Sequence, residues 1–179
     1  MIISKYSTEI TIEFLQTKRE NQYFERKGLG DKDAKPSKIA DELIGMLNAD
    51  GGILAFGISD SGVIEDVSTL GERLSDYRNL CVDFIEPFRN IKLEEVKIAG
   101  KLVFLYHVNQ DIERIYKRKD NEQIFLRVDD KNRKLDREAV RNLEYDKQIR
   151  KFEDEIELEF DVDDLDFILL KRYKDKLNY

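Results

Sequence analysis

Asp60 is the residue whose place in the sequence is best suited to chemistry. It lies near the end of the stretch "NADGGILAFGISDSG" (48–62), in which two adjacent glycines precede an apolar run and Ser-Asp-Ser-Gly follows it. A carboxylate at the end of a buried strand lies at the edge of a sheet, where loops bring functional groups together. Asp is also a good turn former, and the residue types alone favour a plain hairpin turn at Asp60-Ser61-Gly62.

Cationic side chains with aromatic neighbours, between residues 114 and 137, are the second candidate for chemistry. Lys and Arg suit phosphate contacts, and interleaved aromatic rings suit stacking on unpaired bases. Alternating Lys and Arg also keeps an edge strand soluble, so both interpretations stay open. The residues concerned are Tyr116, Lys117, Arg118, Lys119, Phe125, Arg127, Lys131, Arg133 and Lys134.

These cations can act together only if their side chains point to the same side of the two predicted strands. Side chains alternate along a strand, so Lys117 shares a face with Lys119, and Phe125 shares a face with Arg127. A turn at Asp120-Asn121 places these four residues beside one another across the pair. We therefore expect an exposed surface of three cations and one ring. An alternative basic face comprises Arg26, Lys27, Lys32 and Lys35.

The acidity of the chain is concentrated near its C-terminal end. The 179 residues carry a net charge of −7, and 39% of them are charged. Residues 152–179 hold ten acidic and four basic residues, which leaves 28 acidic against 27 basic residues in the remainder. A locally positive face, and with it a nucleic-acid partner, is therefore compatible with an acidic chain.

Several classes of protein are disfavoured by what the sequence lacks. With a single Cys81 and a single His107, the chain cannot form an internal disulfide or a zinc site built from Cys and His. No apolar run approaches the roughly 20 residues of a membrane helix, and residues 1–14 lack the apolar region of a signal peptide. These features predict a cytoplasmic protein without a membrane partner. There is no G-x-x-x-x-G-K-[ST] motif for a nucleotide.

The elements that position these residues follow from hydrophobic periodicity and turn signals. Pro36-Ser37 opens a helix, and Gly51-Gly52 lets the chain leave it sharply, while Gly57 marks a bulge or a close approach of backbone. The order predicts a mixed α/β (α+β) fold with a mostly antiparallel sheet packed against helices. The predicted elements are a strand or helix start at 10–18, strands at 21–28, 53–59, 93–100 and 101–109, two strands within 114–128, and helices at 36–48, 74–88 and 136–152.

The helix followed by "LNADGGILAFGISDSGVI" resembles the central motif of the Schlafen-type AlbA-like domain. That motif runs AxxNxxGG, an apolar strand, then G(V/I)xDxG. Here its positions are held by Asn48, Gly51, Gly52, Gly57 and Gly62. The resemblance extends over about residues 15–145, and in "IFLRVDDKNRKLDREAV" Arg127 takes the family's arginine position while Asp129 replaces its glycine.

The resemblance implies a Schlafen-core-like AlbA-type fold and a nucleic-acid-binding module, with DNA as partner and a regulatory role. It favours phosphate contact by the basic residues, namely Lys27, Lys117, Lys119, Arg127, Lys131 and Arg133. In the family's nucleases a Glu-x4-Glu pair and an aspartate form a metal-dependent RNA-cleaving site. Glu20, Glu25 and Asp60 match those positions, and carboxylates are the ligands that Mg²⁺ or Mn²⁺ prefers.

Three functions are therefore carried forward. The first is a nucleic-acid-binding module, and the alternative is a metal-dependent endoribonuclease that uses Glu20, Glu25 and Asp60. The third is a protein-interaction module that forms a homodimer through edge strands. We expect the nucleic-acid-binding domain to span 1–152, and residues 153–179 to be an acidic linker and the start of a further segment of a longer chain.

Overall fold

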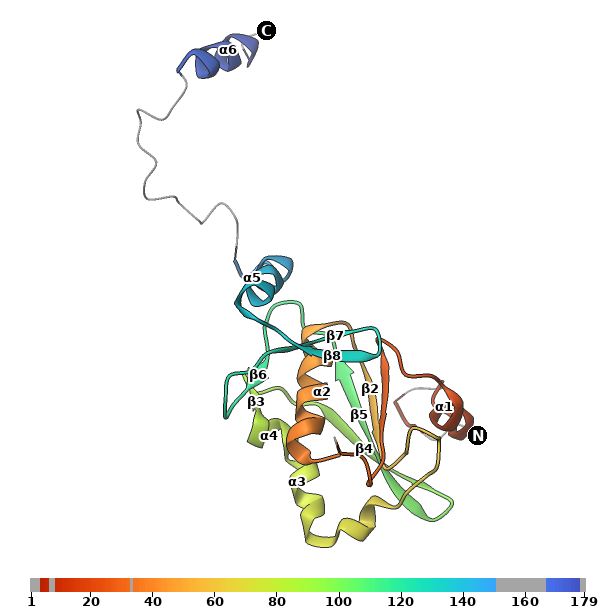
Figure 1. Cartoon of the computed structure of the whole chain (residues 1–179). Coiled ribbons are helices and arrows are strands. Elements are labelled where there is room, and N and C mark those ends of the chain that lie inside the picture. Colours follow the sequence, from red (N-terminus) through yellow and green to blue (C-terminus); the bar gives the residue numbers. More distant parts are fainter. Residues whose placement is uncertain (1–3, 7–8, 33, 151–166, 178–179) are drawn as a thin grey trace. The chain divides into compact units, whose positions relative to one another are not determined.

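Four strands form a mixed sheet in the computed structural model, which describes residues 4–6, 9–32, 34–150 and 167–177. In the sheet the order is β1-β2-β5-β4 (Figure 1). β1 pairs with β2 in parallel, whereas the β2–β5 and β5–β4 pairs are antiparallel. The predicted α+β class with a mostly antiparallel sheet is confirmed. The strands are β1 (Phe24–Lys27), β2 (Gly51–Phe56), β4 (Lys92–Ile98) and β5 (Lys101–Asn109).

Helix α2 (Pro36–Asn48) forms where the helical spacing of apolar residues predicted it. Pro36 occupies the first turn, where a missing N–H costs nothing. The helix ends before Gly51, whose φ of +77° suits glycine, and a Cβ there would lie 2.5 Å from the carbonyl oxygen of Val108. The double glycine therefore lets β2 turn back closely beneath the helix.

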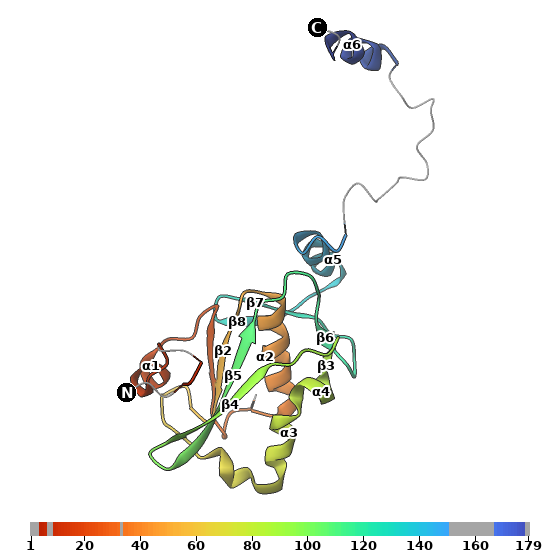
Figure 2. The ribbon, with the colours of Figure 1, turned by 180° about the vertical axis from the view of Figure 1, so that it is seen from behind.

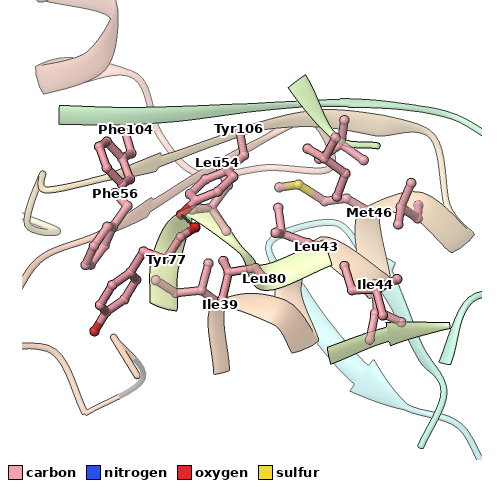
Figure 3. Close-up of a cluster of buried hydrophobic side chains, with 14 of the residues drawn as sticks. Ile39, Leu43, Ile44, Met46, Leu54, Phe56, Tyr77, Leu80, Phe104 and Tyr106 are labelled. Atoms are coloured by element: carbon pink, nitrogen blue, oxygen red, sulfur yellow. Dashed lines mark hydrogen bonds between the residues drawn. The ribbon is translucent and has the colours of Figure 1, made fainter. Parts of the chain in front are cut away.

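One face of the sheet packs against α2 in the larger hydrophobic core. Leu43, Ile44 and Met46 from the helix are fully buried there, together with Leu54 and Phe56 from β2 (Figure 3). The rings of Phe56 and Tyr77 stack with their centroids 4.6 Å apart. The main core thus fixes α2 over the centre of the sheet.

The opposite face of the sheet is covered by the N-terminal segment. In both views α1 and α2 lie on opposite sides of the strands (Figures 1 and 2). Glu94 on β4 anchors this segment, because its carboxylate accepts hydrogen bonds from Ser4 Oγ at 2.6 Å and from the Lys5 N–H at 2.7 Å, and lies 2.9 Å from His107 Nε2. Burial opposes ionisation of Glu94, but these bonds outweigh it and lower the pKa of the carboxyl group. The smaller core on this face comprises Ile10, Leu15, Phe24, Ala55, Ile58, Val96, Ile98, Val103 and Leu105.

The shorter helices and strands up to residue 149 pack around the four-stranded sheet and α2. Residues 10–18 contain a short helix rather than a strand, because Thr11 caps it by accepting a hydrogen bond from the Phe14 N–H. The remaining elements are α1 (Ile12–Thr17), the 3-10 helix η1 (Val67–Arg73), α3 (Leu74–Arg78), α4 (Leu80–Phe84), β3 (Ile85–Glu86), β6 (Lys117–Arg118), β7 (Phe125–Val128), β8 (Lys131–Lys134) and α5 (Arg137–Asp146).

Two sequence-based predictions of these elements are wrong. The single helix at 74–88 is split into α3 and α4 at Asn79, whose φ of −100° and ψ of 10° depart from helical values. The two strands within 114–128 do not pair with each other. β6 pairs with β3, and β7 pairs with β8, a strand that the charged sequence of residues 131–134 concealed.

Residues 150–179 form a separate unit, in which the structure describes helix α6 (Phe167–Leu177). The predicted boundary at 152–153 and the acidic run 153–166 lie outside the described residues. None of the helices formed by the described residues combines the length and hydrophobicity of a membrane span.

Candidate functional site

Arg127 and Glu25 form a buried ion pair at the centre of the candidate site. Arg127 is 1% exposed and Glu25 is 3% exposed, and the Nη2 of Arg127 lies 2.6 Å from the Oε2 of Glu25. The same guanidinium donates to the backbone oxygens of Asn21 at 2.9 Å and Phe24 at 3.2 Å. The pair joins β1 to the β7–β8 hairpin.

Lys27 engages the second carboxylate oxygen of Glu25. Its Nζ lies 2.5 Å from Glu25 Oε1, and its side chain is 15% exposed. Burial opposes the charge on Lys27, but the attraction and hydrogen bond of Glu25 outweigh it, so the pKa of Lys27 is raised. Both oxygens of Glu25 are therefore neutralised by cations of the chain itself.

Glu20 lies close enough to both Glu25 and Asp60 to be affected by their negative charges. The backbone N–H of Arg26 donates to Glu20 Oε1 at 3.0 Å, while Asp60 is exposed in the turn after β2. Burial raises the pKa of Glu20, the hydrogen bond from Arg26 opposes this, and the negative charges of Glu25 and Asp60 raise it further. The structure thus brings the three predicted carboxylates into one region.

These carboxylates are not arranged as ligands of one metal ion. Within the part of the chain that the structure describes, no group of three or more His, Cys, Asp or Glu side chains is placed to hold a metal. A metal ion would have to displace both Lys27 and Arg127 from Glu25. In this arrangement the residues present do not fit Mg²⁺ or Mn²⁺, and we derive no metal-dependent step from them.

Glu42 on α2 is a member of this cluster that the sequence did not reveal. Its Oε2 lies 3.4 Å from Arg127 Nη1. Burial and the negative charge of Glu25 raise the pKa of Glu42 to about 7, although Lys27 and Arg127 oppose the shift. Nothing in its local sequence distinguishes Glu42 from an ordinary helical glutamate, because its neighbours come from β1 and β7.

Glu42 gives the fold a testable pH dependence. Its pKa is about 7 in the folded protein against an ordinary 4.5, so the folded state binds the proton more tightly and loses stability as the pH rises from about 4.5 to about 7. Glu42→Gln mimics the protonated form. We expect the difference in the free energy of unfolding between Glu42→Gln and the wild type to shift in favour of the variant by about 1–3 kcal/mol from about pH 5 to about pH 8.

Urea unfolding at the two pH values measures this gain. Glu72→Gln, at an exposed glutamate on η1, is the matched control and should follow the wild-type pH dependence. If Glu42→Gln also follows it, Glu42 does not hold a proton near neutral pH.

The predicted basic residues fall into two groups in the structure. Lys27 and Arg127 are bound to Glu25, and Arg118 is buried with its Nη1 2.7 Å from Asp41 Oδ1. The prediction that Arg127 lies on an exposed surface beside Lys117 and Lys119 is wrong. Arg127 faces inward on β7. It can be buried there because Glu25 balances its charge and the backbone oxygens of Asn21 and Phe24 accept its N–H groups.

Lys117 and Lys119 remain accessible but lie on and next to β6. The Nζ of Lys117 lies 3.1 Å from Glu122 Oε1, and both residues belong to the segment that pairs with β3. The Nζ of Lys119 donates to the backbone oxygen of Val82 at 3.4 Å. Each cation of this pair is thus already engaged by an acceptor of the chain.

The outward face of the β7–β8 hairpin presents cations without such partners. Val128 pairs with Lys131 and Leu126 pairs with Arg133, so these four side chains share the face turned away from α2. Lys131, Arg133 and the neighbouring Lys134 are exposed, and among the described residues none of them forms an ion pair. This face, which we call the hairpin face, combines positive charge with apolar surface.

The family model described as Schlafen, AlbA_2 matches residues 20–136, well over half of the sequence. The chain belongs to the Schlafen AlbA_2 family. The matched residues include β1, α2, the central sheet and the whole β7–β8 hairpin. The resemblance drawn from the double-glycine motif is therefore confirmed.

Several solved structures are similar to this Schlafen AlbA_2 chain, two of which are described here, and no curated protein matches it significantly. The first is the DIP2311 protein of Corynebacterium diphtheriae, with 20% identity, a TM-score of 0.47, and coverage of 68% of this chain and 23% of that one. The second is the N-terminal domain of a RecG-related protein of Nitrosomonas europaea, with 16% identity, a TM-score of 0.44, and coverage of 61% and 77%. This chain thus spans about a quarter of the length of the first.

The asparagine of the Schlafen AlbA_2 motif has a structural role. The Nδ2 of Asn48 donates to the carbonyl oxygens of Tyr116 at 2.7 Å and Phe125 at 2.9 Å, and its Oδ1 accepts from the Tyr116 N–H at 2.7 Å. Gly57 and Gly62, like Gly51 and Gly52, have positive φ angles. The motif therefore holds α2, β2 and the approach to β7 in register, and the hairpin face depends on it.

Proposed function

We propose that this Schlafen AlbA_2 protein is a nucleic-acid-binding module that contacts phosphates through the hairpin face. The observation that carries the proposal is the charge of Lys131 and Arg133, which no described residue pairs, beside the apolar side chains of Leu126 and Val128. Cations attract the backbone of any nucleic acid, and apolar surface suits contact with sugars or bases. We propose DNA as the partner and regulation in the cytoplasm as the role.

Membership of the Schlafen AlbA_2 family supports this assignment. The ion pairs of Glu25 favour binding over catalysis. A carboxylate with both oxygens held by Lys27 and Arg127 is a structural group in this arrangement. The endoribonuclease that uses Glu20, Glu25 and Asp60, with Mg or Mn, is kept as the alternative outcome of the test.

Salt titration of the double variant Lys131→Ala plus Arg133→Ala tests the proposal. Loss of two phosphate contacts releases fewer counterions, so the slope of log affinity against log salt should fall by roughly one to two units. The loss should be similar for duplex DNA, single-stranded DNA and tRNA, because phosphate contacts carry no sequence information. Fluorescence anisotropy at several salt concentrations measures the slope.

The matched control is Lys117→Ala plus Lys119→Ala, which removes the same charge from β6. We expect its slope to stay close to that of the wild type. A reduced slope in this control alone would move the interface to β6, and an unchanged slope in both variants would contradict binding through either surface. Incubating labelled RNA with Mn²⁺ completes the test, since cleavage that Glu20→Gln abolishes would support the nuclease instead.

A further inference from the structure

A small cavity lies beside the start of α2, at the opposite end of the helix from Asn48. Its volume is about 250 Å³, and it lies between the loop after β1 and the segment formed by η1 and α3. It is smaller than pockets that enclose drug-sized ligands, which start at roughly 300 Å³, and so suits a small group rather than a whole nucleotide. Its walls are formed by Leu29, Asp31, Lys32, Ala34, Lys35, Leu70, Arg73 and Tyr77.

Three cations surround this cavity against one carboxylate. Lys32, Lys35 and Arg73 are exposed at its rim. None of them forms an ion pair with any of the residues that the structure describes, which do not include Asp33. The carboxylate of Asp31 is turned to its own loop, where Oδ2 accepts a hydrogen bond from the Gly28 N–H. Among the residues that line the cavity, cations therefore outnumber carboxylates, while Glu65 next to it is engaged by the N–H of Leu29.

The floor of the cavity makes that charge more effective. Leu29, Leu70 and Ala34 are apolar, and the hydroxyl group of Tyr77 donates to the Ala34 carbonyl oxygen at 3.0 Å. Burial raises the pKa of Tyr77, the positive charge of Arg73 opposes this shift, and the negative charge of Asp76 adds to it. Charges beside such a low-dielectric floor attract an anion more strongly than charges in open water.

We propose that this cavity binds a phosphate group, through Lys32, Lys35 and Arg73, as a site separate from the hairpin face. Arg matches phosphate with two parallel N–H donors, and the two lysines supply point charges from the other wall. The separation follows from the course of α2. The hairpin contacts the middle of the helix, where Asn132 Nδ2 donates to the Asp41 carbonyl oxygen at 2.7 Å, whereas the lysines of the cavity precede Pro36.

Titration of the isotope-labelled full-length protein with inorganic phosphate at low ionic strength tests this site by NMR. We expect saturable shifts of the amide signals of Gly30 and Arg73 at millimolar phosphate, and no such shifts with sodium chloride at matched ionic strength. Arg73→Gln should weaken the phosphate affinity at least fivefold. Lys38→Gln is the matched control outside the cavity, because Lys38 lies 3.3 Å from Asp41, and should leave the affinity unchanged.

Competition identifies the source of the phosphate. If single-stranded DNA displaces inorganic phosphate from the cavity, the cavity binds a phosphodiester of a nucleic acid. If DNA binds the protein without displacing inorganic phosphate, the cavity binds a free phosphate or a phosphomonoester. Shifts that are absent, or equal with chloride, or unaffected by Arg73→Gln would overturn the site. These readouts do not use the hairpin face, so they stand apart from the test of nucleic-acid binding.

Discussion

Replacing Arg127 by alanine should destabilise the fold by roughly 3–5 kcal/mol, the cost typical of breaking a buried ion pair from one side. The substitution leaves Glu25 buried with Lys27 as its remaining cation, and it frees the backbone oxygens of Asn21 and Phe24 from their donor. It also separates β1 from the hairpin. Arg127→Lys should recover part of the loss, because an ammonium group can pair with Glu25 but cannot reproduce the planar set of donors.

Chemical denaturation of purified variants measures this effect. Arg133→Ala is the matched control, an arginine on the adjacent strand whose side chain is exposed, and its free energy of unfolding should stay within about 0.5 kcal/mol of the wild type. Equal, small losses in both variants would show that the Arg127–Glu25 pair does not hold the hairpin. The comparison also separates the two roles of the basic residues, since Arg133→Ala should weaken nucleic-acid binding without unfolding.

Replacing Asn48 by alanine should cost about 3–4 kcal/mol, nearly as much as the loss of Arg127. The change deletes three buried hydrogen bonds and leaves the Tyr116 N–H and the carbonyl oxygens of Tyr116 and Phe125 without a partner. Each unmet buried group costs roughly 1–3 kcal/mol, and relaxation recovers part of the sum. Asn48→Asp should be no better, because a carboxylate would face two carbonyl oxygens.

The stability of Asn48→Ala is compared with that of Asn142→Ala, at an exposed asparagine of α5. We expect the α5 variant to be close to the wild type in thermal unfolding, while Asn48→Ala melts well below it. An Asn48→Ala protein with wild-type stability would contradict a structural role and return this residue to the list of candidate binding residues.

Local sequence signals predicted much of the fold. The spacing of Ile39, Leu43 and Leu47 gave the helix, and Gly51-Gly52 gave its sharp end, because each of these features acts over a few residues. The β8 strand could not be found this way. Its residues are all polar or charged, and the hydrogen bonds that make it a strand come from β7.

The candidate site was predicted in part, and for a similar reason. The family motif indicated Glu20, Glu25 and Asp60, and the structure places them in one region. The motif did not indicate that Arg127 pairs with Glu25, because the two residues are 102 positions apart in the sequence. Alternation along residues 125–128 put Phe125 and Arg127 on one face, but only the surrounding chain decides that this face is the buried one.

The N-terminal segment, finally, lies outside the stretch that matches the family but belongs to the folded core. The family match begins at residue 20, yet Ile10 and Leu15 exclude water from one side of the sheet, and Glu94 holds Ser4 and Lys5 against it. A protein that inherits the shared stretch must supply its own cover for this side. Any segment that brings apolar side chains and a hydrogen-bond donor to this side meets that need, so the N-terminal sequence can change without affecting the hairpin face or the Arg127–Glu25 ion pair.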